Sequence, residues 1–321
     1  MEEYSYSKLD TFEQCPYRYK LTYIDGYRSE ESTLALDLGS TAHKGKEIWG
    51  EFLINNKEPD LEHILDVVQN GREYWKIHII NGKEVEEELE EDIMGFDEIK
   101  EKYFEEYYQR CSKSGMTYDE KIDLYIQSLN QKELKNGWKV LEVEKPFRFI
   151  YENKCILHGF IDRIDINENG DLRVVDYKTS KDIYKSEKLA TPLQMFIYAL
   201  ACENMYGKLP IEFIYDFIFL NKQQNACTNG YYNRGTKKLN KLLDDIKQCS
   251  EKEEFIPKPS PLCHWCSFSN NTCAKDKKLN GMCEYYSLWT PKNKRYDVNK
   301  KWRDFANNTD NQTIKRKEFK W

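Results

Sequence analysis

The spacing of apolar residues changes along this chain and divides it into helical and extended segments. Near the N-terminus, apolar side chains recur every three to four residues over 7–24 and 41–54, which predicts two helices, the first interrupted by Pro16. From residue 139 onward, several stretches have apolar positions that alternate or form short continuous runs, which is typical of strands. The pattern predicts four strands, at 139–151, 156–166, 172–178 and 211–220.

Turn-forming and capping residues connect these expected strands. The run 167–171, Asn-Glu-Asn-Gly-Asp, is typical of a tight hairpin turn between the second and third strands. Between the third and fourth strands the chain predicts a helix with Thr191 as its cap, Pro192 at its first position and Gly207 just past its end. The order of these elements predicts an α/β fold in which helices flank a mixed central sheet.

Composition narrows the class of protein. The net charge of −6 leaves nucleic-acid binding undecided, because the segment 292–320 carries ten Lys and Arg against four acids. We find no apolar run long enough to cross a bilayer and no apolar signal-peptide core, so we expect a cytoplasmic protein of a bacterium or phage with no membrane partner. In that compartment ten cysteines argue against a disulfide scaffold.

Acidic residues, a lysine and a histidine lie at particular positions of the predicted strands and helices. Asp162 lies near the end of one strand, and Asp176 and Lys178 end the next, where alternation puts both on one face. Carboxylates are natural ligands of Mg2+ and Mn2+, and His43 on an upstream helix would add a nitrogen ligand. Such ions assist phosphodiester hydrolysis, and a nearby ammonium group orients water or stabilises the developing charge.

A glutamine and a tyrosine follow at helical spacing. Gln194 and Tyr198 are four residues apart, so they share one helix face, where they would steady the lysine or a phosphate. Simple packing is the alternative, because LQMFIYALA also suits a buried helix.

Taken together, these motifs resemble the PD-(D/E)XK nucleases of the RecB-type branch, which includes AddB C-terminal nucleases and CRISPR-adaptation exonucleases. That branch has a histidine, then G-x-x-D-x-[IV]-D, D/E-x-K and Q-x-x-x-Y, and a Cys-Pro segment near the N-terminus. The resemblance implies a restriction-endonuclease-like core. It also implies that His43, Asp162, Asp176 and the Tyr177 carbonyl bind the metal, and that Lys178 is the catalytic lysine, with Gln194 and Tyr198 completing the catalytic set.

A second metal site is indicated by the C-terminal cysteines. Cys263 and Cys266 form a C-x-x-C pair, and Cys273 and Cys283 follow. Thiolates at this spacing suit either zinc or an iron–sulfur cluster. The resemblance favours a [4Fe-4S] cluster held by Cys15, Cys263, Cys266 and Cys273. The alternative is a local zinc knuckle of Cys263, Cys266, Cys273 and Cys283.

The expected function is a Mg2+- or Mn2+-dependent DNA exonuclease that acts on single-stranded or frayed ends in recombination, repair or phage DNA metabolism. A nucleic-acid-binding module with an idle site and an endonuclease of the same fold are the alternatives. The sequence contains no G-x-x-x-x-G-K-[ST] motif, so we expect any helicase partner to be a separate chain.

Five segments make up the predicted organisation. The acidic segment 61–135 is interpreted as a helical insertion that roofs the cleft, and its run 84–106 should face away from DNA. Aromatic residues in or near it either stack on bases or pack in a core: Tyr74, Trp75, Tyr103, Tyr107 and Tyr108. The other segments are N-terminal helices (1–60), a nuclease core (136–250), a cysteine-rich segment (251–285) and a basic tail (286–321).

Overall fold

The computed structural model contains two compact units. One, the sheet unit, comprises Thr33–Gly235 with Met1, and the other, the cysteine unit, comprises Glu2–Ser32 and the chain from Thr236 onward. The structure describes residues 1–29, 32–71, 74–80, 83–89, 93–107, 116–130, 134–180, 182–185, 189, 193–226, 230–269 and 278–283. Between 74 and 89 it describes the backbone of two strands and not their side chains.

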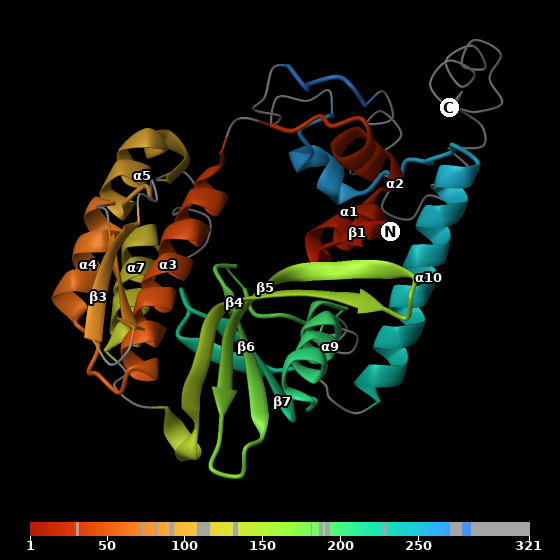
Figure 1. The fold of residues 1–321 in the computed structure, drawn as a ribbon. Helices are drawn as coiled ribbons and strands as arrows, with labels where there is room; N and C mark the ends of the chain where they lie inside the picture. The colour runs from red at the N-terminus through yellow and green to blue at the C-terminus, as the bar shows by residue number, and fades with distance from the viewer. Residues whose placement is uncertain are drawn as a thin grey trace. The chain divides into compact units, whose positions relative to one another are not determined.

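A mixed sheet forms the centre of the sheet unit (Figure 1). Its strands are β4 (Lys139–Tyr151), β5 (Cys155–Ile166), β6 (Leu172–Lys178), β7 (Glu212–Phe217) and β8 (Lys222–Asn225). They lie side by side in that order, antiparallel except for the β6–β7 pair, which is parallel. The predicted mixed sheet is confirmed, and its first three strands match the expected ranges to within one residue.

Helices on either side of the parallel strand pair complete this unit. They are α3 (Leu34–Ile54), α4 (Leu61–Asn70), α5 (Phe96–Lys102), α7 (Tyr118–Leu129) and α9 (Leu193–Tyr206). Buried residues of α3, α4, α5 and α7 pack with those of β4, β6 and β7 in one hydrophobic cluster. The helix α9 connects β6 to β7 and ends at Gly207, whose φ of 68° is left-handed, as predicted. Thr191 and Pro192, its expected start, lie outside the described residues.

The segment 61–135, which the sequence predicts to be mostly helical, contains α4, α5 and α7 and also two strands. Between α4 and α5 the backbone forms an antiparallel hairpin of β2 (Tyr74–Ile80) and β3 (Lys83–Leu89). Tyr107 is buried and donates a hydrogen bond to Asp119, which makes it a core residue. Tyr103 donates one to Asp37, which ties it to α3. The side chains of Tyr74 and Trp75, and all of Tyr108, lie outside the described residues.

The cysteine unit is built from short elements. They are β1 (Glu3–Tyr4), α1 (Tyr6–Gln14), α2 (Pro16–Tyr19), a π-helical turn (Lys20–Ile24) and a 3-10 turn (Pro261–Trp265). The helix α10 (Tyr231–Glu251) begins in the sheet unit, and its residues from Thr236 onward belong to the cysteine unit. The predicted interruption at Pro16 is confirmed. Cys15 adopts an extended conformation, with φ −162° and ψ 107°, between α1 and α2. Proline suits the first position of α2 because no intrahelical partner is needed for its nitrogen.

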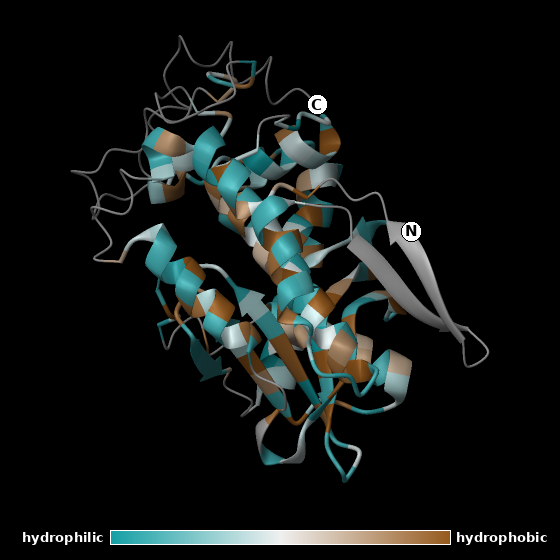
Figure 2. Ribbon diagram, turned by 90° about the vertical axis from the view of Figure 1, so that its left-hand side faces the viewer, coloured by the Kyte–Doolittle hydropathy of each residue, from teal (hydrophilic) through white to brown (hydrophobic). Residues whose placement is uncertain are grey.

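Hydrophobic residues are distributed as in amphipathic elements. Most helices change between teal and brown along their length in Figure 2, so that each carries polar and apolar positions together. Among the described residues, none of the helices combines the length and the apolar character that crossing a membrane requires.

Candidate metal-dependent active site

The two predicted aspartates lie on neighbouring strands. Asp162 belongs to β5 and Asp176 to β6, and the register pairs Arg163 with Val175 beside them. At this point the two strands begin to separate, and the backbone N–H of Tyr177 donates a 2.7 Å hydrogen bond to Asp162 Oδ2. The end of strand pairing therefore frees a backbone donor that holds the first carboxylate beside the second strand.

Lys178 forms an ion pair with Asp176 on the same face of β6, as alternation predicts. Asp176 is only 1% exposed, and burial raises the pKa of its carboxyl to about 6, against the opposing effect of Lys178 and with a further increase from Asp162. Burial lowers the pKa of Lys178, but the interaction with Asp176 outweighs it and the pKa of Lys178 is raised overall. The ammonium group of Lys178 is therefore charged beside the carboxylates.

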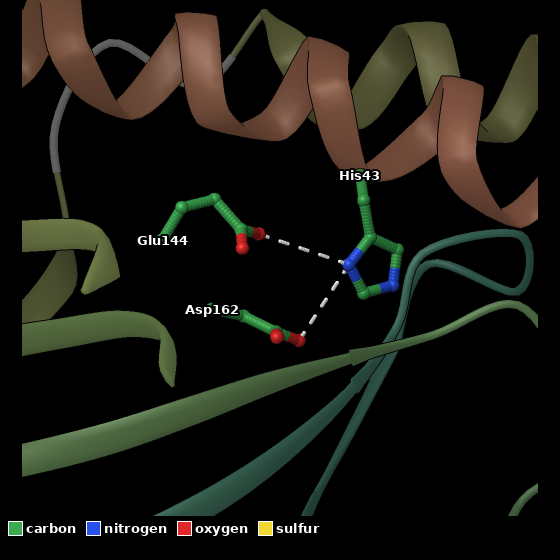
Figure 3. A group of neighbouring side chains, drawn as sticks. All are labelled: His43, Glu144 and Asp162. Carbon is green, nitrogen blue, oxygen red and sulfur yellow. Dashed lines mark ion pairs between the residues drawn. The ribbon is translucent and has the colours of Figure 1, made fainter. Parts of the chain in front are cut away.

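A histidine from α3 and a glutamate from β4 complete the group around Asp162 (Figure 3). His43 Nδ1 lies 3.8 Å from Asp162 Oδ2 and 4.0 Å from Glu144 Oε1. The potential ligand atoms of these three side chains all lie within 4.8 Å of one another. The His43 ring also meets the Tyr177 ring edge-to-face, with centroids 5.8 Å apart, which fixes how the imidazole approaches.

Glu144 was not predicted as a site residue. The pairs Val143–Arg163 and Lys145–Ile161 place it opposite Asp162, and its φ of 42° is left-handed. Burial, then Asp162 and Glu47, raise the pKa of Glu144 to about 8, while Lys44 lowers it. Asp162 raises the pKa values of both Glu144 and Asp176, and neighbouring carboxylates of this kind are stabilised together by a cation.

The donor set fits a hard divalent cation. Carboxylate oxygens of Glu144 and Asp162 are ligands that Mg2+ and Mn2+ prefer, and an imidazole nitrogen from His43 is compatible with Mn2+. Asp176 is near enough to this group for Asp162 and His43 to affect its pKa.

The predicted glutamine and tyrosine form a relay to the lysine. Lys178 Nζ donates to Gln194 Oε1 at 3.1 Å, and Gln194 Nε2 donates to the Tyr198 hydroxyl at 2.9 Å. Tyr198 is buried and its ring meets Phe147 of β4 edge-to-face at 6.1 Å. Both residues of α9 therefore position the ammonium group, in addition to packing.

The neighbouring charged residues of β5 lie on the opposite face. Arg163 and Asp165 are both buried and form an ion pair at 2.9 Å, and Arg173 pairs with Asp165 at 2.6 Å. Arg163 Nη1 donates to the Tyr177 hydroxyl at 3.0 Å. These charged groups can be buried because each is paired with an opposite charge. The Arg163 hydrogen bond also holds Tyr177 in place, and the backbone N–H of Tyr177 binds Asp162.

Thiols gather in a pocket within the cysteine unit. Cys15, Cys263, Cys266 and Cys283 line it. The backbone N–H of Lys258 donates to Cys15 Sγ at 3.4 Å, and that of Ser260 donates to Cys263 Sγ at 3.3 Å. Burial raises the pKa values of the Cys263 and Cys266 thiols, and Cys15 raises both further. Close thiols that accept backbone N–H groups suit a thiolate-bound metal centre. Cys273 lies outside the described residues.

Comparison with known proteins identifies the family. The sequence model of the PD-(D/E)XK nuclease superfamily matches residues 3–273. The chain belongs to this superfamily. PD-(D/E)XK nucleases use divalent metals, in agreement with the donor set of His43, Glu144 and Asp162.

Individual relatives cover a smaller part of this PD-(D/E)XK protein. It is 33% identical over 81 residues to one subunit of the ATP-dependent helicase/deoxyribonuclease of Streptococcus pyogenes serotype M6, and equally to that of serotype M18. The corresponding protein from serotype M12 is 32% identical over the same length. Each match covers 25% of this chain and 8% of the relative, so this chain matches about one twelfth of the length of these relatives.

Proposed function

We propose that the protein is a Mg2+- or Mn2+-dependent deoxyribonuclease that digests DNA from its ends. The observation that carries this proposal is the convergence of His43, Glu144 and Asp162 around one point, beside the ion pair of Asp176 and Lys178. The alternative of an idle binding module is disfavoured, because each predicted catalytic position holds a residue that is competent for hydrolysis.

The side chains have separate roles in this proposal. His43, Glu144, Asp162 and Asp176, with the Tyr177 carbonyl, would hold the divalent cation, which supplies positive charge to the phosphate and makes a water acidic. Lys178 orients the attacking water or stabilises charge on the phosphate oxygens. Gln194 and Tyr198 hold the ammonium group in position through the two hydrogen bonds that join them to it.

The choice of DNA rests on the superfamily and on relatives whose name includes deoxyribonuclease. Those relatives are also named as helicase subunits, which is consistent with a separate helicase or recombination protein as partner for this chain. Action on single-stranded or frayed ends remains our expectation, with the segment 61–135 roofing the cleft.

For the cysteine unit we propose a structural [4Fe-4S] cluster. Cys15, Cys263 and Cys266, which line one pocket, would be three of its ligands, and Cys273 would be the fourth. Four thiolates satisfy such a cluster. It would join segments that lie far apart in sequence, and offset the chain entropy lost in closing a long loop. Zinc at Cys263, Cys266, Cys273 and Cys283 is the alternative.

The decisive experiment compares end-labelled linear DNA with closed circular DNA, single- and double-stranded, with and without Mn2+. We expect rapid metal-dependent digestion of linear strands, and far slower cleavage of circular single strands. Asp176→Ala should abolish digestion, with the fold checked by circular dichroism. Equal rates on linear and circular single strands would favour an endonuclease, and an Asp176→Ala protein as active as the parent would refute the assignment of the site.

A further inference from the structure

The β4–β5 hairpin continues beyond the point where β5 stops pairing with β6. The pairing of β5 with β6 stops at Arg163–Val175, whereas β4 and β5 remain paired to Tyr151–Cys155 (Figure 1). We call residues 145–161, the outer part of this hairpin, the arm. The arm begins one residue beyond Glu144 on β4 and ends one residue before Asp162 on β5, so it is directly adjacent to the candidate site.

The two faces of the arm differ sharply in burial. Phe147, Leu157 and Ile161 are buried on one face. On the other face, Phe160 is 60% exposed and lies directly opposite Pro146, which is also exposed. A single exposed ring is common on protein surfaces, but a ring next to an exposed proline forms an apolar patch, and such patches mark binding surfaces when they are contiguous.

The exposed face continues away from the site in further rows. Arg148 lies opposite His158, and Ile150, 59% exposed, lies opposite Ile156. Arg148 is exposed as well. Lys145 lies on the buried face and pairs with Glu142, and Lys154 pairs with Glu152, so the basic group that the exposed face carries is the Arg148 guanidinium. A guanidinium group on this face suits a phosphate.

Phe160 is placed where a base next to a reacting phosphate would lie. It is two residues from Asp162 along β5, a spacing of roughly 7 Å, and the strand alternation puts both on the same side. Ring stacking requires an open base face, which an unpaired nucleotide offers and a paired one inside a duplex does not. A cationic and aromatic surface beside a phosphodiesterase site is therefore suited to single-stranded DNA.

We propose that the exposed face of the arm binds the single-stranded DNA that leads to the carboxylate site, with Phe160 stacked on a base next to the scissile phosphate and Arg148 against the phosphate backbone. This inference rests on the proposed nuclease function and adds its substrate path. It also assigns a role in the reaction to the exposed side of the hairpin, which the metal site does not use.

The test measures binding separately from hydrolysis. In buffer without divalent cations, a fluorescent single strand of thymidines is titrated into the parent, Phe160→Ala, Phe160→Trp and Ile211→Ala proteins. Ile211 is a matched control, because it is 57% exposed and lies beside Leu172, at the end of β6 opposite to Asp176. We expect Phe160→Ala to weaken binding about tenfold, and Ile211→Ala to leave it unchanged.

The Phe160→Trp protein gives a second and independent signal. We expect it to bind like the parent, and the fluorescence of the introduced indole to be quenched when the strand is added. With Mn2+ present, Phe160→Ala should raise KM for linear single strands and leave kcat at saturation within about twofold, which a general loss of folding would not do.

The two proposals fail in different ways. Absence of hydrolysis by the parent protein would refute the nuclease function and leave the binding measurement valid. Unchanged affinity of Phe160→Ala together with unquenched indole fluorescence would refute the arm as a DNA path. A change in oligomeric state of Phe160→Ala without a change in DNA affinity would likewise refute it, and would make this face a protein contact.

Discussion

The carboxylate site and the thiol pocket position their side chains in contrasting ways. In the carboxylate site, Asp162 and Asp176 are fixed by the register of two paired strands, and Asp176 is almost wholly buried. The thiol pocket is lined by residues from helix ends, a 3-10 turn and loops, and its cysteines are only half-buried. One site is assembled by secondary structure, and the other by segments with little regular structure of their own.

The hydrophobic cluster around the carboxylate site is also larger than the one around the thiol pocket. The sheet unit has a large buried cluster to which α3, α4, α5, α7, β4, β6 and β7 contribute. Beside the thiols the buried cluster consists of Tyr17, Leu21, Phe268 and Leu279. Since burial of apolar area is the main source of stability, the sheet unit has a core to hold its site without metal, whereas the thiol pocket needs a further crosslink. Removing the divalent cation from the sheet unit should therefore abolish hydrolysis and leave the fold intact. Removing the metal centre from the cysteine unit should instead lower its stability.

The largest effect is expected from Lys178→Ala. Loss of the ammonium group beside Asp176 should lower kcat at least about 100-fold, because charge on the phosphate is no longer stabilised. Lys208→Ala is the control, since Lys208 is exposed and donates to Gly170 O at the turn between β5 and β6. Digestion of linear DNA under Mn2+ measures both variants. Retention of most activity by Lys178→Ala would contradict its catalytic role.

The next effect concerns the thiol pocket. Protein purified without oxygen should be brown and contain roughly four iron atoms per chain. Cys15→Ala should remove the colour and lower Tm by about 10 °C, because a metal crosslink contributes several kcal/mol. Mn2+ affinity of the carboxylate site should stay the same. Cys249→Ala, in α10, is the matched control.

Two results would change this picture of the pocket. A colourless protein with about one zinc per chain, unaffected by Cys15→Ala, would favour the zinc knuckle. Equal Tm values for Cys15→Ala and the parent would remove the contrast between the two units, because the pocket would then be stable without its crosslink.

Most of the sheet could be predicted because its signals are local. Alternation located β4, β5 and β6, and spacing alone put Asp176 and Lys178 on one face. The helix α3 was predicted to start at Thr41 but starts at Leu34, where Thr33 caps it. Glycine and serine at positions 39 and 40 are weak helix formers, so the sequence pattern did not predict the first turns of this helix. The burial of Leu34 and Leu38 stabilises those turns.

The missed features depend on contacts that sequence spacing does not encode. Glu144 joins the site only because β4 pairs with β5 in one particular register, which an irregularity between Val140 and Glu142 shifts by one residue. Its left-handed φ could not be read from a glutamate, which disfavours that conformation. The β2–β3 hairpin was missed because its glutamate-rich second strand has low strand propensity.

A moderate effect is expected from pH, and it tests whether the carboxylate site holds its charges in place without metal. The pKa values of Glu144 and Asp176, about 8 and about 6, lie above those of ordinary carboxyl groups. Raised pKa values mean that the folded protein binds more protons than the unfolded chain, so its metal-free stability should fall as pH rises from about 5 to 8.

Metal binding should show the opposite trend, because bound carboxylates are deprotonated. Mn2+ affinity, measured by calorimetry, should increase from pH 6 to pH 8, and Mn2+ should raise Tm most at pH 8. Glu144→Gln should flatten both trends. Glu142→Gln is the control, because Glu142 pairs with Lys145. Mn2+ affinity that is independent of pH in the parent would exclude Glu144 as a ligand.

The smallest effect should come from Gln194, which tests how rigidly the sheet unit positions its lysine. Gln194→Ala removes the hydrogen bonds to Lys178 and Tyr198, but the ion pair with Asp176 remains. A single hydrogen bond contributes about 1 kcal/mol, so kcat should fall about fivefold while Mn2+ affinity is unchanged. Gln194→Glu should retain the acceptor for Lys178, and Tyr198→Phe should cost less than Gln194→Ala. If Gln194→Ala instead weakens Mn2+ binding as strongly as Asp162→Ala, the relay acts on the metal ligands. The lysine would then be held by Asp176 alone.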